Sequence, residues 1–412
     1  MNSTAAQWPG RMLALAFAFF AGCPVLANLV GAYLADGQSF GVTAGIACGF
    51  LLLAGLAALR LGFPRDAVAT LRGPLLALAI ISSLFWTHWI LLTLLSPSPQ
   101  PMMQYQVLQV AVWMLLPMLL FALWRRWIDP YLVLRLLVVI DALFILGLSL
   151  RWLFDLGINQ GGRWHAGYSL EAIRSGRYAT MSLWVFALAA LCPSEVVPFR
   201  LKLLALAGMP LALLMMVAAN SRGPWLALAI TVAVTGIPLA RLLAVRIGQD
   251  ARVLAVLLLA LAGIAAFIAW QIGGVESDFD RLFTLTSDGG SAAGRVTLVA
   301  DHLRLLHDTP MALLSGCGYG HGIFYPHNVL IEALVNGGLL AFSLLLLMYG
   351  TALHAWLALT RRDDVPTLLV FGLFLLSLVG SQVSGSIAGD LTWFFPLLLL
   401  LTLARRPTTE LT

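Results

Sequence analysis

Charged residues are scarce in this sequence. They make up 10% of its 412 residues, whereas a soluble globular protein carries about 25%. Hydrophobic residues make up 60%, and the mean hydropathy is +0.92. The composition therefore predicts a polytopic membrane protein in contact with membrane lipids, and it excludes an ordinary soluble domain.

Signatures of metal and nucleic-acid binding are also lacking. The four cysteines form no CxxC pair and the histidines match no HExxH motif, so neither a disulfide framework nor a zinc site is indicated. No basic run is mixed with aromatic residues, so nucleic acid is not an expected partner. The acidic stretch Glu276–Asp280 is a candidate site for a hard cation, but a solvated loop is the favoured interpretation. We expect neither a metal nor another cofactor.

Long apolar runs, by contrast, recur along the chain. Each is roughly 17–25 residues long, the length that crosses the hydrocarbon of a bilayer as a helix. They predict an all-α integral membrane protein with about twelve transmembrane helices. These lie near residues 12–34, 41–59, 75–95, 103–124, 131–150, 178–194, 202–219, 224–240, 253–272, 329–353, 366–385 and 390–404. The first run is too long for a signal-peptide core and is expected to remain as a membrane helix.

Lysine and arginine set the expected orientation. With both termini in the cytoplasm, about two thirds of the 24 basic residues fall on the cytoplasmic side, as the positive-inside rule requires. The basic residues on the outer side are all arginines, and they are confined to 151–177, Ser221–Gly223 and 273–328. This concentration of arginine on the disfavoured side predicts that the outer face binds an anion.

The apolar runs and the orientation divide the chain into three parts. Residues 1–272 are expected to form a transmembrane bundle with an outer loop at 151–177, residues 273–328 a large periplasmic loop, and residues 329–412 the C-terminal transmembrane helices. In the large loop, Ser291 is a suitable N-cap for a helical pattern that Thr309-Pro310 ends. The apolar positions of that pattern are Val296, Val299, Leu303 and Leu306. They predict an amphipathic helix that lies on the membrane or packs over the bundle.

A glycine-rich stretch, Gly316–Asn328, directly precedes an apolar run that begins at Val329. Its glycines allow the backbone to approach a ligand closely. Imidazole titrates near neutral pH, so His327 is a plausible general base at the mouth of a membrane helix. The alternative is that His327 and Asn328 only cap that helix. The histidines that compete as the base are His165, His302, His307 and His321.

Arg222 and Arg295 are the leading anion ligands. Two guanidinium groups can hold a pyrophosphate through several charge-assisted hydrogen bonds, and a helix N-terminus near Ser291 would add backbone donors. Ion pairs with nearby aspartates or contacts with lipid phosphates would explain a single arginine equally well. Glu332 and Asn336 lie four apart on one helix face, where they either orient a substrate or bridge to a neighbouring helix.

The chain resembles the O-antigen ligase family of bacterial envelope proteins, which belongs to the O-antigen ligase/polymerase superfamily. The predicted topology is similar, with twelve helices and a large outer loop before the tenth. The motifs that resemble the family's are Ser221-Arg222-Gly223, Gly294-Arg295, Gly316-Cys317-Gly318-Tyr319-Gly320, and His327-Asn328 with Gly338 after it. Family members usually carry Gly, Thr or Tyr where this chain has Ala341, a departure that concerns local packing only.

This resemblance implies a type C glycosyltransferase-like fold and a metal-independent inverting reaction. A polysaccharide would move from undecaprenyl pyrophosphate to the lipid A–core oligosaccharide at the periplasmic face of the bacterial inner membrane. His327 would be the base, and Arg222 and Arg295 would stabilise the leaving pyrophosphate. The expected substrate-binding residues are Arg163, Asn328, Ser221, His321 and Tyr319.

Other functions share parts of this pattern. An O-antigen or exopolysaccharide polymerase has the same outline and a different acceptor, and a protein O-glycosyltransferase is a further alternative. From another class, a lipid-linked glycan flippase or transporter would need charged residues through several helices to line a path. The sequence has few such residues within its apolar runs, which favours an enzyme that acts at the outer face.

Overall fold

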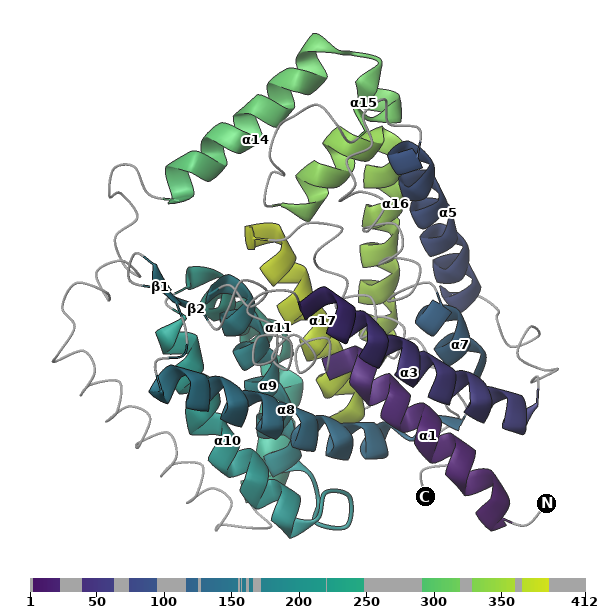
Figure 1. The fold of residues 1–412 in the computed structure, drawn as a ribbon, viewed down its shortest axis with the longest axis vertical. Coiled ribbons are helices and arrows are strands. Elements are labelled where there is room, and N and C mark those ends of the chain that lie inside the picture. The colour runs from purple at the N-terminus through teal and green to yellow at the C-terminus, as the bar shows by residue number, and fades with distance from the viewer. Residues whose placement is uncertain are drawn as a thin grey trace, which may run out of the picture.

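The computed structural model describes thirteen stretches of the chain and is almost entirely helical there (Figure 1). The described residues are 3–22, 39–62, 74–94, 116–124, 127–154, 156, 158–160, 163–165, 172–219, 221–247, 291–318, 328–359 and 365–384. The helices are α1 (Ser3–Gly22), α3 (Ser39–Leu61), α5 (Pro74–Leu94), α7 (Leu116–Trp124), α8 (Pro130–Leu153), α9 (Ala172–Leu191), α10 (Phe199–Ala218), α11 (Arg222–Ile247), α14 (Ser291–Asp308), α15 (Ala312–Ser315), α16 (Val329–Leu359) and α17 (Val365–Ser384).

Among the described residues, five helices are long and apolar enough to cross a membrane. The spans are Pro130–Leu153, Phe199–Ala218, Gly223–Ala244, Val329–Leu357 and Val365–Gln382. Large apolar side chains on these helices point away from the bundle; Ile237, for example, is 70% exposed. An outward apolar surface on apolar helices is what contact with lipid requires, and it confirms the helical membrane character predicted from composition. The predicted spans at 253–272 and 390–404 lie outside the described residues.

Helix α9 packs against four other helices, α8, α10, α11 and α17 (Figure 1). Glycines make the close approaches possible. A Cβ at Gly208 of α10 would lie 2.5 Å from the Phe186 ring, and a Cβ at Gly372 of α17 would overlap the Trp184 indole. The indole nitrogen of Trp184 also donates a hydrogen bond to the carbonyl of Leu368 at 3.2 Å, which ties α9 to α17.

A short β-hairpin interrupts the helical pattern in the predicted outer loop 151–177. Strand β1 (Ile158–Gln160) pairs antiparallel with β2 (Arg163–His165), with Gln160 opposite Arg163. The sequence prediction contained no strand here. The signal was present, because a Gly-Gly pair between two short segments is typical of a two-residue hairpin connection.

Helix α14 begins at Ser291 and ends at Asp308, directly before Thr309-Pro310, as the sequence predicted. Its inner face differs from the predicted apolar stripe: Leu303 is 47% exposed, whereas His302 is fully buried. The reason is that α14 packs against the first part of α16: Leu306 shares a buried cluster with Val335, and Leu305 packs against that cluster. These contacts rotate the buried face toward position 302. Helix α14 therefore packs against the start of α16, whereas its contact with the membrane stays a prediction.

Helix α16 is broken at Gly338, whose φ of 68° and ψ of −171° are not helical. The segment Val329–Gly337 turns away from the rest of α16 and lies beside α14 and α15 at one end of the molecule (Figure 1). Two glycines permit this contact. A Cβ at Gly338 would overlap the carbonyl oxygen of Leu314, and a Cβ at Gly316 would overlap that of Asn336.

We predict that Gly338→Ala destabilises the protein. A side chain at positive φ costs about 1–2 kcal/mol even without an overlap, and here the methyl group would also meet the Leu314 carbonyl. The matched control is Gly350→Ala in the same helix, where a Cβ meets nothing within 4 Å and stability should be unchanged or slightly raised. Unfolding in an SDS titration, followed by tryptophan fluorescence, measures both variants. Equal midpoints for the two variants would contradict the prediction.

Candidate functional site

Four helix ends meet at one end of the bundle. Helices α9 and α11 begin there, since a Cβ at Gly176 would lie 2.9 Å from the Pro224 ring. The last turns of α17 lie there too, because Arg177 of α9 packs on Gly380. The start of α16 joins them through a hydrogen bond between Asn328 and Gln382. We call this region the outer site, because the predicted orientation places it on the outer face.

Arg177 lies inside the outer site and is only 7% exposed. Its Nη2 donates to the carbonyl of Ser377 at 3.5 Å, and a Cβ at Gly380 would lie 2.6 Å from its Nε. Gly380 therefore makes room for the guanidinium group against α17. The sequence analysis counted Arg177 among the outer arginines but did not select it as a site residue. Its signal was an ionisable group in the first turns of an apolar helix, where such groups are often functional.

Ser221 and Arg222 mark the start of α11 in the same region. Ser221 is buried, and Arg222 is the first residue of the helix. Pro224 is tolerated in this first turn, where the missing backbone donor has no helical partner to lose. The free backbone N–H groups and the helix dipole make such a helix start attractive to an anion. The predicted arginine motif is thus placed beside buried Arg177 by the contact between Gly176 and Pro224.

Asn328 caps the first segment of α16 and ties it to α17. Its Oδ1 accepts a hydrogen bond from the Ile331 backbone N–H at 3.0 Å, as an N-cap does. Its Nδ2 donates to the main-chain carbonyl of Gln382 at 3.0 Å, and the Gln382 Oε1 accepts from the Leu330 N–H at 3.4 Å. Capping is therefore a role of Asn328, whereas its contact with a substrate stays a prediction. Gln382 was not selected from the sequence, because a glutamine near the end of an apolar run carries no motif.

The break in α16 is held by partners from two other parts of the chain. The last carbonyls of a helical segment need donors from outside it. Cys317 N donates to the Val335 carbonyl at 2.8 Å, and Gly318 N donates to the Asn336 carbonyl at 3.0 Å. The His88 ring of α5 meets the Gly337 carbonyl at 2.8 Å. The first residues of the glycine-rich stretch are thus docked on the same segment that Asn328 caps.

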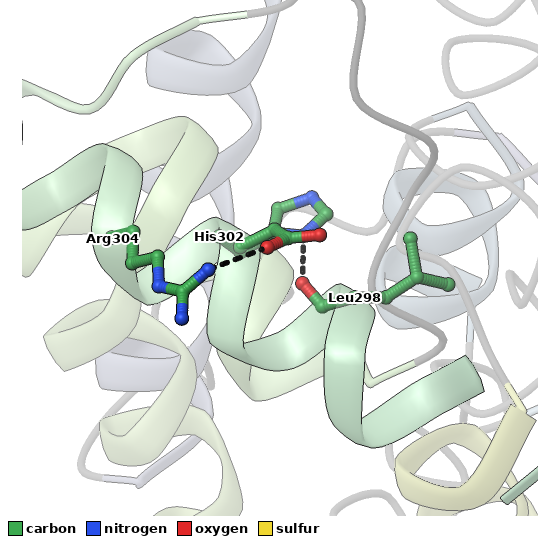
Figure 2. A network of polar contacts seen from close by, with 4 residues as sticks. Leu298, His302 and Arg304 are labelled. Atoms are coloured by element: carbon green, nitrogen blue, oxygen red, sulfur yellow. Dashed lines mark hydrogen bonds and ion pairs between the residues drawn. The ribbon is translucent and has the colours of Figure 1, made fainter. Parts of the chain in front are cut away.

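Buried polar residues accompany this segment. Glu332 and Asn336 are 2% and 3% exposed, so the one helix face that their spacing predicted for them points into the protein interior. His302 of α14 is fully buried, and its Nδ1 lies 2.6 Å from the Leu298 carbonyl of its own helix (Figure 2). The exposed ion pair of Arg304 with Asp301, at 3.5 Å, lies on the same helix. The Nδ1 of His302 is thus engaged within its own helix, and its ring is shielded from solvent.

Several predicted site residues are described only in part. Arg222 and Arg295 are placed by their backbones in the first turns of α11 and α14, and Arg163 by its backbone in β2. His327, His321 and Tyr319 lie outside the described residues, as does the acidic stretch Glu276–Asp280. Within the described part of the chain, no group of three or more His, Cys, Asp or Glu side chains is arranged to hold a metal ion.

The arrangement of the outer site suits the binding of an anionic ligand. The start of α11 and the buried Arg177 guanidinium both bring positive charge or partial charge to one region. No model of a known protein family matches the chain, and no curated protein matches it significantly. The chemical interpretation therefore depends on the chain's own residues.

We predict that Asn328→Ala lowers the free energy of unfolding by about 1 kcal/mol relative to Asn328→Ser, because serine retains the N-cap acceptor and alanine does not. Both variants lose the Nδ2 bond to Gln382, so comparing them isolates the cap. SDS unfolding followed by tryptophan fluorescence gives the difference. If serine and alanine are equally destabilising, the cap contributes nothing measurable and the assignment of Asn328 as N-cap is wrong.

Proposed function

We propose that this chain is an O-antigen ligase with a type C glycosyltransferase fold. It would transfer a polysaccharide from undecaprenyl pyrophosphate to the lipid A–core oligosaccharide at the periplasmic face of the bacterial inner membrane. One observation carries the proposal: three features meet at one end of the bundle. These are buried Arg177, the helix start at Ser221-Arg222, and the capped start of α16. In the sequence, His327 directly precedes the cap of α16. This combination offers an anion site beside a candidate base.

The reaction follows from these groups. His327 accepts the proton of an acceptor hydroxyl as the oxygen attacks the anomeric carbon of the donor glycan. The bond from that carbon to the pyrophosphate oxygen breaks, and undecaprenyl pyrophosphate leaves from the opposite face, which inverts the anomeric configuration. Charge then develops on the leaving oxygen. Arg222 and Arg295 stabilise this charge without a metal ion, and such preorganised groups typically contribute about 10²–10³ in rate.

The remaining site residues are assigned either to the donor or to the glycan and acceptor. Ser221 and Arg163 are proposed to bind the donor's phosphates and sugars from the start of α11 and from β2. Tyr319 and His321 of the glycine-rich stretch are proposed to contact the glycan or the acceptor. Arg177 is added to the donor side, because its guanidinium lies between α9 and α17 next to that helix start.

The described residues also bear on the flippase alternative. Their buried charged side chains are Asp141, Arg177, Lys202 and Glu332. Arg177 and Lys202 lie near the starts of α9 and α10, and Glu332 lies near the start of α16. Only Asp141 of α8 lies deep within a span, and it hydrogen-bonds Ser182. Charged residues that line a path across the membrane are therefore not found in the described helices, which favours an outer-face enzyme over a flippase.

We predict that His327→Gln abolishes transfer although donor binding survives. Glutamine can hydrogen-bond but cannot accept the hydroxyl proton, whereas the arginines that hold the pyrophosphate are unchanged. The measurement is turnover of purified polyprenyl-pyrophosphate glycan and lipid A–core in proteoliposomes, alongside donor affinity. The control is Arg200→Gln, an exposed position at the opposite end of the bundle, which should retain full turnover. Normal turnover of His327→Gln would make His327 a positioning residue and His321 the better candidate base.

We also predict that wild-type turnover is unchanged in excess EDTA, because arginines take the role of the metal at the pyrophosphate. The same proteoliposome assay, run with and without chelator, gives the answer. Loss of turnover that magnesium or manganese restores would overturn metal independence. Glu276, Asp278 and Asp280 would then become the leading ligands.

A further inference from the structure

A histidine outside every predicted motif contacts the broken helix. His88 lies in α5, within the apolar run predicted at 75–95, and its ring is half-buried. Polar groups within such runs are costly and are usually retained for a specific contact. The contact here is with the Gly337 carbonyl at 2.8 Å, 249 residues away in the chain. A carbonyl oxygen can only accept, so the Nε2 of His88 carries the hydrogen and donates it.

This hydrogen bond lies at the break in α16, where the segment Val329–Gly337 changes direction relative to the rest of the helix. Gly338 interrupts the helix directly after Gly337, and Cys317 and Gly318 occupy the two preceding carbonyls. His88 supplies the third donor, from α5. The direction of the segment relative to the rest of α16 is therefore fixed at the break by the glycine-rich stretch and by His88.

A small change of angle at the break is enough to displace the first residue of the segment Val329–Gly337. At 1.5 Å per residue, a segment of nine residues is about 13 Å long, so a tilt of about 5° at the break moves its first residue by about 1 Å. A misplacement of that size in a reacting group can cost up to about 10² in rate. The residue that precedes this segment's N-cap is His327, the proposed base. The other end of the segment is fastened separately, by Asn328 to Gln382.

We propose that His88 is a positioning residue for the base: by donating to the Gly337 carbonyl it fixes the angle of the segment that follows His327. The proposal rests on the glycosyl transfer proposed above. His88 contacts neither donor nor acceptor in this role. Its loss therefore lowers kcat and leaves the donor KM unchanged, because the arginines at the outer site are not displaced.

The test compares four variants in the proteoliposome transfer assay. His88→Ala should lower kcat by about tenfold to a hundredfold with a donor KM within about twofold of the wild type. His88→Phe keeps a ring without the N–H donor and should be as slow as alanine. His88→Gln restores an amide donor and should recover most of the lost kcat. Thr87→Ala changes an exposed neighbour on α5 and should match the wild type.

A second readout does not depend on activity. Hydrogen–deuterium exchange followed by mass spectrometry should show faster exchange in peptides covering 328–337 for His88→Ala and His88→Phe, with no change in α9 or α10. Wild-type kcat in His88→Ala or in His88→Phe would overturn the proposal, and so would an effect confined to the donor KM. If the wild-type protein itself transfers no glycan, the proposed function fails. Unchanged exchange in both variants would separately show that His88 does not hold the break.

Discussion

The break in α16 at Gly338 is the constraint on which the arrangement of the outer site depends. Backbone groups that leave a helix inside a membrane protein must find partners in the protein, because lipid offers none. Here Cys317, Gly318 and His88 supply the donors for three successive carbonyls, Val335 to Gly337. Gly316 and Gly338 lack the side chains that would prevent this contact. The same set of bonds therefore satisfies the broken helix and docks the glycine-rich stretch beside it.

Positive charge is concentrated in the part of the outer site that α9, α11 and α17 form. A buried guanidinium group needs acceptors, and Arg177 has one in the Ser377 carbonyl. Gly380 and Gly176 bring α17 and α11 close to the same part of α9, so the Ser221-Arg222 helix start lies near Arg177. The arrangement matches the sequence-based expectation that arginines on the outer face bind an anion. A pyrophosphate is the anion that the proposed donor presents.

Sequence reasoning predicted the helices better than the contacts between them. The spans in α8, α10, α11, α16 and α17 follow from apolar runs, whose lengths the bilayer fixes. The break at Gly338 was missed, because Asn336-Gly337-Gly338 also fits close packing of a continuous helix. The prediction that Leu303 belongs to the inner face of α14 was wrong. Packing against α16, and not amphipathicity alone, determines which face of α14 is buried.

For the site residues too, local motifs were predictable from the sequence and contacts between distant residues were not. Ser221, Arg222 and Asn328 could be selected because they stand in motifs at predicted helix starts. Gln382 and His88 could not, since each takes its role from a residue that is distant in the chain: Asn328 and Gly337, respectively. Arg177 carried a signal as an ionisable group near the start of an apolar helix, but its partner Ser377 is distant too. No local pattern encodes such pairings. The roles of His327, His321, Tyr319, Arg163 and Arg295 remain predictions from the sequence.

Photo-crosslinking of the donor tests the central claim most directly. The probe is a polyprenyl-pyrophosphate glycan with a diazirine on the isoprene unit next to the pyrophosphate, applied to the protein in membranes and mapped by mass spectrometry. The account predicts crosslinks in peptides that cover the start of α9, the start of α11, the start of α16 and the end of α17. Crosslinks confined to the opposite helix ends, such as the start of α10 or the end of α16, would contradict it.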